Sequence, residues 1–222
     1  MGSVVFTDME AFLIPSSIKV HLLMCTTLIN IVSKASRILG AIESTRPRCR
    51  SGMESLCSLN KAIEELKSII KQCTQSSKLY LALRGDIIHS RCIRSRRLME
   101  ASLDDIQNMV PLSLASQQVC ELGADLRGAT FIIEGAEEEA AKAVKEILYN
   151  QFVTKSEVEE WIKVAMSRLN INSPKALLVE KKSITMMLHN LGDGQKKTIL
   201  TFLLHLLRKH GKQIVETYSS QE

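Results

Sequence analysis

Residues 56–83 read LCSLNKAIEELKSIIKQCTQSSKLYLAL, and the spacing of their apolar side chains predicts the fold class. Those side chains recur in alternating steps of three and four, which keeps one stripe on one side of an α-helix. They are Leu56, Leu59, Ile63, Leu66, Ile70 and Cys73. Charged and amide side chains occupy the opposite side. Because such a helix needs partner helices to cover its stripe, the stretch predicts a helical domain.

The composition of the whole chain also favours long helices. Aromatic residues make up 4% of the 222 residues, which is few for a β-sandwich, and 10 Gly and 4 Pro leave room for few turns. We expect an all-α protein, an antiparallel four-helix bundle followed by additional shorter helices. The expected parts are an N-terminal lead-in at 1–16, the helical bundle at 17–151, a C-terminal helical extension at 152–212 and a tail at 213–222.

Capping signals place the expected helix ends. The S/T-x-x-E pattern of a capping box occurs at 7–10, 51–54 and 154–157, and Ser173-Pro174 reads as a cap followed by a first-turn proline. Gly211 should end the last helix. A long helix is expected from Ser17, with its inner face formed by Ile18, Leu22, Cys25, Ile29, Val32 and Leu39.

The sequence carries no catalytic, cofactor-binding or metal-binding motif that we recognise. It has no phosphate-binding glycine loop and no G-x-S-x-G turn. The five histidines are dispersed, so we expect each at the surface or its boundary, and the glutamates at 137–139 and 159–160 read as solvated faces. The six cysteines form no C-x-x-C pair and predict small core residues in a reducing compartment.

The balance of charge bears on partners and location. A net charge of +5 permits contact with anionic lipid or nucleic acid without requiring it, and no nucleic-acid-binding module appears. The most apolar run, residues 20–32, is too short and too polar to cross a bilayer, and no secretory signal is evident. We therefore expect a cytoplasmic or nuclear protein, with peripheral contact at the plasma membrane at most.

Basic residues gather on the third long helix. Arg91, Arg94, Arg96 and Arg97 are either a solvated face or an anion-binding patch. An acidic or phosphorylated partner would pair with such arginines, so these four are the candidate partner-binding residues.

Several blocks of the sequence resemble one known family. They are CRSG at 49–52, LCSL at 56–59, SSKLYL at 76–81, Gly85-Asp86, SLDDIQNMVPLSLASQ at 102–117, RLNINSPKALLVEKKSI at 168–184 and ILTFLLHLLRKHGK at 199–212. In this order the blocks look like the N-terminal domain of plant U-box E3 ubiquitin ligases of the armadillo-repeat class. The resemblance covers most of residues 17–212.

The chain departs from that family in two ways. Its third helix is unusually basic, and the U-box itself is missing. A U-box would show a Cys-Pro-Ile-type opening, an Asp-Pro pair and a second Cys-Pro, but Pro15, Pro47, Pro111 and Pro174 all lie in other contexts. The resemblance therefore implies either a fragment of a longer ligase or a truncated gene product.

The resemblance implies a partner-recognition domain acting in protein ubiquitination. Its partners would be receptor kinases or ubiquitination substrates, read by an exposed groove or helix face. E2 binding and catalysis by this chain are not expected without the U-box. The alternative is a peripheral bundle that binds anionic lipid, similar to four-helix cell-death domains.

Overall fold

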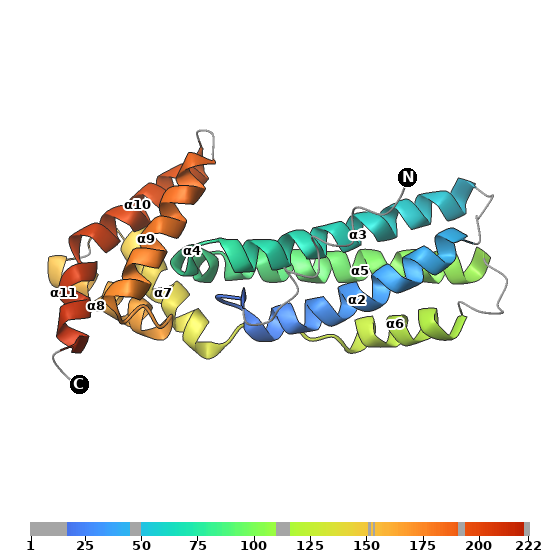
Figure 1. Ribbon diagram of the computed structural model, residues 1–222, viewed down its shortest axis with the longest axis horizontal. Helices are drawn as coiled ribbons and strands as arrows, with labels where there is room; N and C mark the ends of the chain where they lie inside the picture. The colour runs from blue at the N-terminus through green and yellow to red at the C-terminus, as the bar shows by residue number, and fades with distance from the viewer. Residues whose placement is uncertain are drawn as a thin grey trace. The chain divides into compact units, whose positions relative to one another are not determined.

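The computed structural model describes residues 17–44, 50–109, 116–150, 152, 154–190 and 194–219. All regular secondary structure in these ranges is helical (Figure 1), which confirms the all-α class. Contacts divide the chain into two compact units. The first falls mainly within Leu22–Gln72 and Ile87–Ile132, and the second within Lys19–His21, Cys73–Asp86 and Ile133–Glu222. The main change of unit thus follows Ile132, whereas the sequence led us to place a boundary after residue 151.

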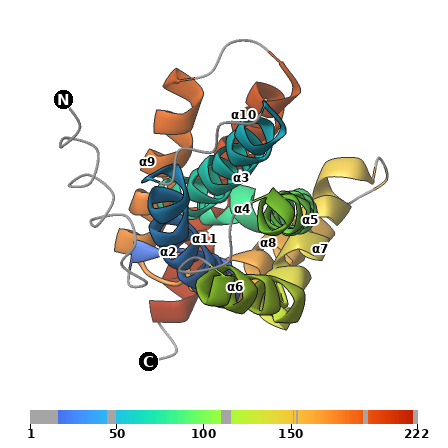
Figure 2. The ribbon, with the colours of Figure 1, turned by 90° about the vertical axis from the view of Figure 1, so that its right-hand side faces the viewer.

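The first unit is built from α2 (Leu22–Ser44), most of α3 (Arg50–Gln75), most of α5 (Gly85–Met109), and α6 (Ser116–Gly128). In Figures 1 and 2 these helices lie alongside one another. On α3, Leu59, Ile63, Leu66 and Ile70 are almost completely buried. The apolar stripe read from the sequence is therefore the buried side of this helix.

Polar contacts join the helices of the first unit. Between α3 and α5, Ser55 Oγ donates to Asp105 at 3.2 Å, and Arg91 donates to Gln72 Oε1 at 2.8 Å. Arg96 of α5 donates to the Ala129 carbonyl just beyond α6, at 2.9 Å. Lys34 of α2 forms an ion pair with Asp125 of α6.

The start of α2 differs from the expectation. The helix begins at Leu22 rather than Ser17, because His21 has a φ of 63° and cannot continue a right-handed helix. Its buried side is also rotated: Leu22 is exposed, and the core side chains are Met24, Cys25, Leu28, Ile31, Val32, Ala35 and Ile38. Apolar residues occur nearly all round α2, so periodicity alone could not select the inward side.

The length of the apolar stretch in α2 was also underestimated. Among the described residues, one segment, Leu22–Gly40, is long and apolar enough by composition to cross a bilayer. Met24, Leu28, Ile31 and Val32 of that segment are nevertheless buried against other parts of the protein. A core helix of a globular domain meets the same compositional test.

The second unit holds α4 (Lys78–Leu83), α7 (Gly135–Tyr149), α8 (Lys155–Arg168), α9 (Pro174–His189), α10 (Gln195–Lys209) and α11 (Gly211–Ser219). Helix α7 contacts α4 and α8, while α9 contacts α10 and α11. All five residues of α4 after Lys78 are buried. The short apolar stretch that follows α3 is thus itself a core helix.

The capping signals had mixed outcomes. At the start of α8, Thr154 Oγ1 accepts from the Glu157 N–H while the Glu157 carboxylate accepts from the Thr154 N–H, which confirms that capping box. Ser173 caps α9, as expected. Ser51 lies inside α3, since that helix already includes Arg50, so the box at 51–54 does not open it. The box at 7–10 lies outside the described residues.

The chain after α10 is helical where we expected a stop and a tail. Helix α10 ends at Lys209, but Gly211 begins α11, whose Ile214 and Val215 are buried. A Cβ atom at Gly211 would lie 2.8 Å from Leu177 Cδ1 of α9. Glycine here allows the close approach of α11 to α9, because a Cβ would displace the Leu177 side chain.

Candidate partner-binding surfaces

The four candidate arginines of α5 do not form one patch. Arg91 donates through Nε to Glu65 Oε1 at 2.8 Å as well as to Gln72, and Arg96 is committed to Ala129. Arg94 is 75% exposed in its side chain, and Arg97 is also exposed. At about 100° of rotation per residue, Arg91 and Arg96 point about 140° apart. Two of the four therefore hold the first unit together, and two face solvent.

The contact of Arg91 with α3 has an electrostatic consequence. Its hydrogen bond to the Glu65 carboxylate, together with its charge, holds the pKa of Glu65 below the usual range against the opposing effect of burial. The pair joins two long helices across a half-buried boundary. Arg91 is thus explained by the fold without a ligand.

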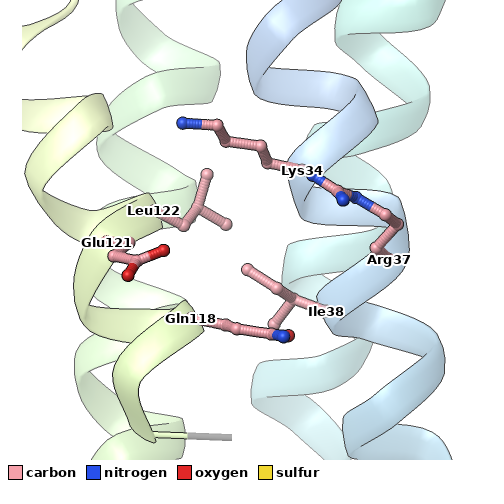
Figure 3. A pocket seen from close by; sticks show the side chains of 6 residues that line it. All are labelled: Lys34, Arg37, Ile38, Gln118, Glu121 and Leu122. Atoms are coloured by element: carbon pink, nitrogen blue, oxygen red, sulfur yellow. The ribbon is translucent and has the colours of Figure 1, made fainter.

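A shallow cavity of about 180 Å³ lies between α2 and α6 in the first unit. Figure 3 shows the two helices on its two sides, with Lys34, Arg37 and Ile38 on α2 facing Gln118, Glu121 and Leu122 on α6. Positive and negative groups are mixed, and Lys34 is already paired with Asp125. The cavity therefore has no single charge that would select a ligand.

Helix α9 presents the most apolar exposed face of the second unit. Leu178 is 67% exposed, Val179 is 51% exposed and Met186 is 56% exposed. Lys175 and Lys182 are also exposed and fall among them at helical spacing. We call Lys175, Leu178, Val179, Lys182 and Met186 the α9 surface. The sequence did not single it out, because apolar residues in a helix are usually taken as core.

A buried carboxylate fixes α9 in place. Glu180, on the opposite side from the α9 surface, accepts from Ser77 Oγ and from the backbone N–H groups of Lys78 and Leu79, the latter two at 3.0 Å. These are unpaired donors at the N-terminus of α4, and a carboxylate there also suits the helix dipole. Helix α9 therefore caps α4 from about 100 residues away, and these hydrogen bonds anchor α9 within the second unit.

A second buried carboxylate was also missed by the sequence. Glu137 of α7, expected to be solvated, accepts from the His21 backbone N–H, and its Oε2 lies 2.7 Å from His21 Nδ1. His21 Nε2 lies 3.2 Å from the Leu81 carbonyl oxygen of α4. Since both neighbours can accept, this geometry suits a protonated ring that donates from both nitrogens. The expectation that His21 lies at the surface was wrong: it is 1% exposed.

The two partners shift each other's pKa. Burial alone would lower the pKa of His21, but the hydrogen bond and charge of Glu137 outweigh it and raise the pKa above 6.5. Burial alone would raise the pKa of Glu137, but the bonds from His21 lower it below 4.5. His210 is also buried, contrary to expectation, and burial lowers its pKa. The His21–Glu137 pair holds the start of α7 to the segment before α2. The described residues contain no group of three His, Cys, Asp or Glu placed to hold a metal ion.

Comparison with known proteins gives relatives but no match to a family model or a solved structure. U-box domain-containing protein 5 of Arabidopsis thaliana is 34% identical over 173 residues, which cover 77% of this chain. U-box domain-containing protein 45 of the same plant is 33% identical over 91% of the chain, and U-box domain-containing protein 7 is 30% identical over 93%. The chain is a homologue of plant U-box domain-containing proteins. It spans about a quarter of the length of these relatives, from 24% to 27%.

Proposed function

We propose that this chain is a protein–protein interaction module that recognises partners or substrates for a plant U-box E3 ubiquitin ligase. The observation that carries the proposal is the similarity to U-box domain-containing proteins over most of the chain. The described structure adds helices with exposed apolar and basic groups, which is what recognition by a helix face requires. Receptor kinases and ubiquitination substrates are the partner classes that the family resemblance implies.

The first unit would supply this module with an antiparallel four-helix bundle. In support, Ser55 near the start of α3 meets Asp105 near the end of α5, while Gln72 near the end of α3 meets Arg91 near the start of α5. Paired contacts that run in opposite directions are typical of antiparallel neighbours.

The module itself would be non-catalytic and would not bind an E2 enzyme. In the family it resembles, E2 binding belongs to the U-box, whose Cys-Pro motifs the sequence lacks. We expect it in the cytoplasm or the nucleus, with peripheral contact at the plasma membrane at most, and the location of a fluorescent fusion would test this. Arg94 and Arg97, the two exposed arginines of α5, remain candidates for contact with acidic or phosphorylated groups.

Three assays test the proposal. Proximity labelling in plant cells would nominate partners, and each would then be purified and titrated against the purified chain. We expect at least one direct complex with a Kd of about 10 µM or tighter. If every purified candidate fails to bind at about 100 µM, the recognition role is wrong. Ubiquitin chains formed by this chain with E1 and E2 alone would refute the non-catalytic assignment.

The lipid-binding alternative is tested in parallel. Co-sedimentation with anionic vesicles at low salt should leave the chain in solution if its role is protein recognition. Binding to vesicles that is lost when Arg94 and Arg97 are changed to Gln would instead favour the membrane, because basic patches bind anionic lipid electrostatically.

A further inference from the structure

Helix α9 is apolar on two sides. Its inner side buries Leu177 and Ile184. Its outer side carries the α9 surface, whose five residues fall within about 100° of the helix circumference at 100° per residue. Most single exposed apolar residues need no explanation, but a set at helical spacing on one face resembles an interface.

Two hollows of the second unit flank this outer side. One, of about 230 Å³, is lined by Leu178 together with Pro174, Leu177 and Val215. The other, of about 280 Å³, is lined by Val179 together with Ile171 and Ala176. The α9 surface is thus a ridge with an apolar depression on each side. Apolar side chains of a partner would be held in such depressions.

The charges around the ridge are positive. The ridge itself carries Lys175 and Lys182. The first hollow is lined by Lys181 and Lys212, and the second by Lys19 and Lys78. Of the two nearby acids, Glu180 is used by the N-terminus of α4 and Glu216 lies 3.7 Å from Lys212. Within the described ranges, Lys175, Lys181 and Lys182 have no carboxylate partner. Positive charge that the protein leaves unpaired around an apolar ridge favours an acidic partner.

Two of these lysines have a lowered pKa, which is consistent with an excess of positive charge around the ridge. Burial lowers the pKa of Lys181, and the charge of Arg208 lowers it further. Burial also lowers the pKa of Lys19, and of the charges around it Glu180 opposes the change while Lys78 adds to it. Each hollow therefore contains a cation held close to another cation.

We propose that the α9 surface docks an acidic amphipathic helix of a partner protein. Apolar side chains of that helix enter the two hollows, and its carboxylates pair with Lys175, Lys181 and Lys182. The ridge runs from residue 175 to 186, about 17 Å at 1.5 Å per residue, which matches about three turns of a docked helix. This inference rests on the proposed function, since it names the class of partner that the recognition module takes.

The test selects ligands without assuming their sequence. A displayed library of helical peptides with one randomised face is panned on the wild-type chain, and enriched peptides are titrated by fluorescence anisotropy. We expect peptides rich in Glu and Asp with Leu, Ile or Phe at helical spacing. Changing Leu178 and Val179 together to Ala should raise the Kd at least about ten-fold, because both apolar anchors are lost.

Matched variants separate docking from folding. Ala keeps the helix propensity of α9, and circular dichroism verifies the fold of each variant. Leu98→Ala on α5, another exposed leucine of a helix, should leave the Kd unchanged. Changing Lys175 and Lys182 together to Gln should weaken binding about five-fold or more at about 50 mM salt and much less at about 500 mM, as screening removes the charge attraction.

Other outcomes would overturn the proposal. The proposal fails if no peptide is enriched, or if the enriched peptides are basic or uncharged. It also fails if acidic peptides bind the variant with Leu178 and Val179 changed to Ala, here called the α9 double variant, as tightly as they bind the wild type. Self-association, or vesicle binding, that the α9 double variant abolishes would assign the surface to a second copy or to lipid. Tighter peptide binding after removal of residues 1–16, which contain Asp8 and Glu10 among apolar residues, would assign it to the chain itself. If a purified natural partner binds the α9 double variant normally, this inference fails while the proposed function stands.

Discussion

Replacing Glu137 by Gln should destabilise the second unit strongly. The carboxylate accepts from both the backbone N–H and the ring of His21, and both residues are buried. Removing one partner of a buried ion pair leaves the other charge without compensation. Such a loss lowers the free energy of unfolding by about 3 to 5 kcal/mol. The amide of the new Gln side chain can still accept one hydrogen bond, so we expect a loss near the lower end of that range. Thermal unfolding is the first assay, with an expected fall in Tm of about 6–12 °C for a chain of this length.

The pH dependence of the wild type gives a second measure. Because the pKa of His21 is raised above 6.5, its contribution is complete below pH 6.5 and is lost as pH rises through the raised value. Because the pKa of Glu137 is lowered below 4.5, its contribution is complete above pH 4.5 and is lost as pH falls through the lowered value. The pair should thus stabilise most between pH 4.5 and 6.5. The wild type should lose stability as pH rises above 6.5, because the pair is lost there. The Glu137→Gln variant should not show that loss.

Glu138→Gln is the matched control for this experiment. Glu138 is the next residue of α7 and is exposed, so its replacement should change stability by less than about 0.5 kcal/mol. The reasoning is refuted if the two variants unfold at the same temperature, or if Glu137→Gln keeps the wild-type dependence on pH. A His21 ring that titrates below pH 6.5 by NMR would also contradict it.

Three further substitutions test other parts of the structure. Glu180→Ala should destabilise by about 2–4 kcal/mol, since it leaves buried donors of α4 unpaired, and hydrogen exchange at Leu79 should accelerate. Gly211→Ala should cost about 1–3 kcal/mol in urea unfolding, because its Cβ would press on Leu177 Cδ1. Arg91→Ala should cost about 1 kcal/mol in the same assay through loss of its half-buried bonds to α3.

Each of these has a control at a comparable site. Glu160→Ala removes an exposed carboxylate and should change neither stability nor exchange in α4; equal exchange in both variants would reject tertiary capping. Gly40→Ala in α2 adds a Cβ with no neighbouring atom within 4 Å and should stabilise by about 0.5–1 kcal/mol. A stabilising Gly211→Ala would disprove the steric argument. Arg97→Ala should be nearly neutral, and a cost equal to that of Arg91→Ala would contradict the distinction between them.

Local periodicity was enough to predict much of the fold. The α3 stripe, the capped starts of α8 and α9 and the all-α class depend on residues close together in sequence, and the structure has them where expected. The inward side of α2 could not be chosen, because that helix is apolar almost all round. Its late start could not be foreseen either, since the left-handed φ of His21 depends on contacts with Glu137, 116 residues away.

The candidate surface was less accessible to sequence reasoning. Arg91, Arg94, Arg96 and Arg97 are close in sequence, but helical rotation points Arg91 and Arg96 in different directions and the fold uses both. The α9 surface lies in a segment, LLVEKK, whose apolar residues fit a buried helix equally well. The sequence did offer one signal of an exposed apolar side: apolar residues fall on two sides of this helix, with lysines between them. Only the positions of neighbouring helices show which side stays exposed.

The way α4 is held has a consequence during synthesis of the chain. The apolar residues of α4 leave the ribosome long before Glu180, which lies 103 residues after Ser77. At about 5–20 residues per second, that interval is about 5–20 s. During this interval, Leu79, Leu81 and Leu83 have no completed core in which to pack. A nascent chain stalled within this interval should therefore be a target for chaperones and, if released, should aggregate.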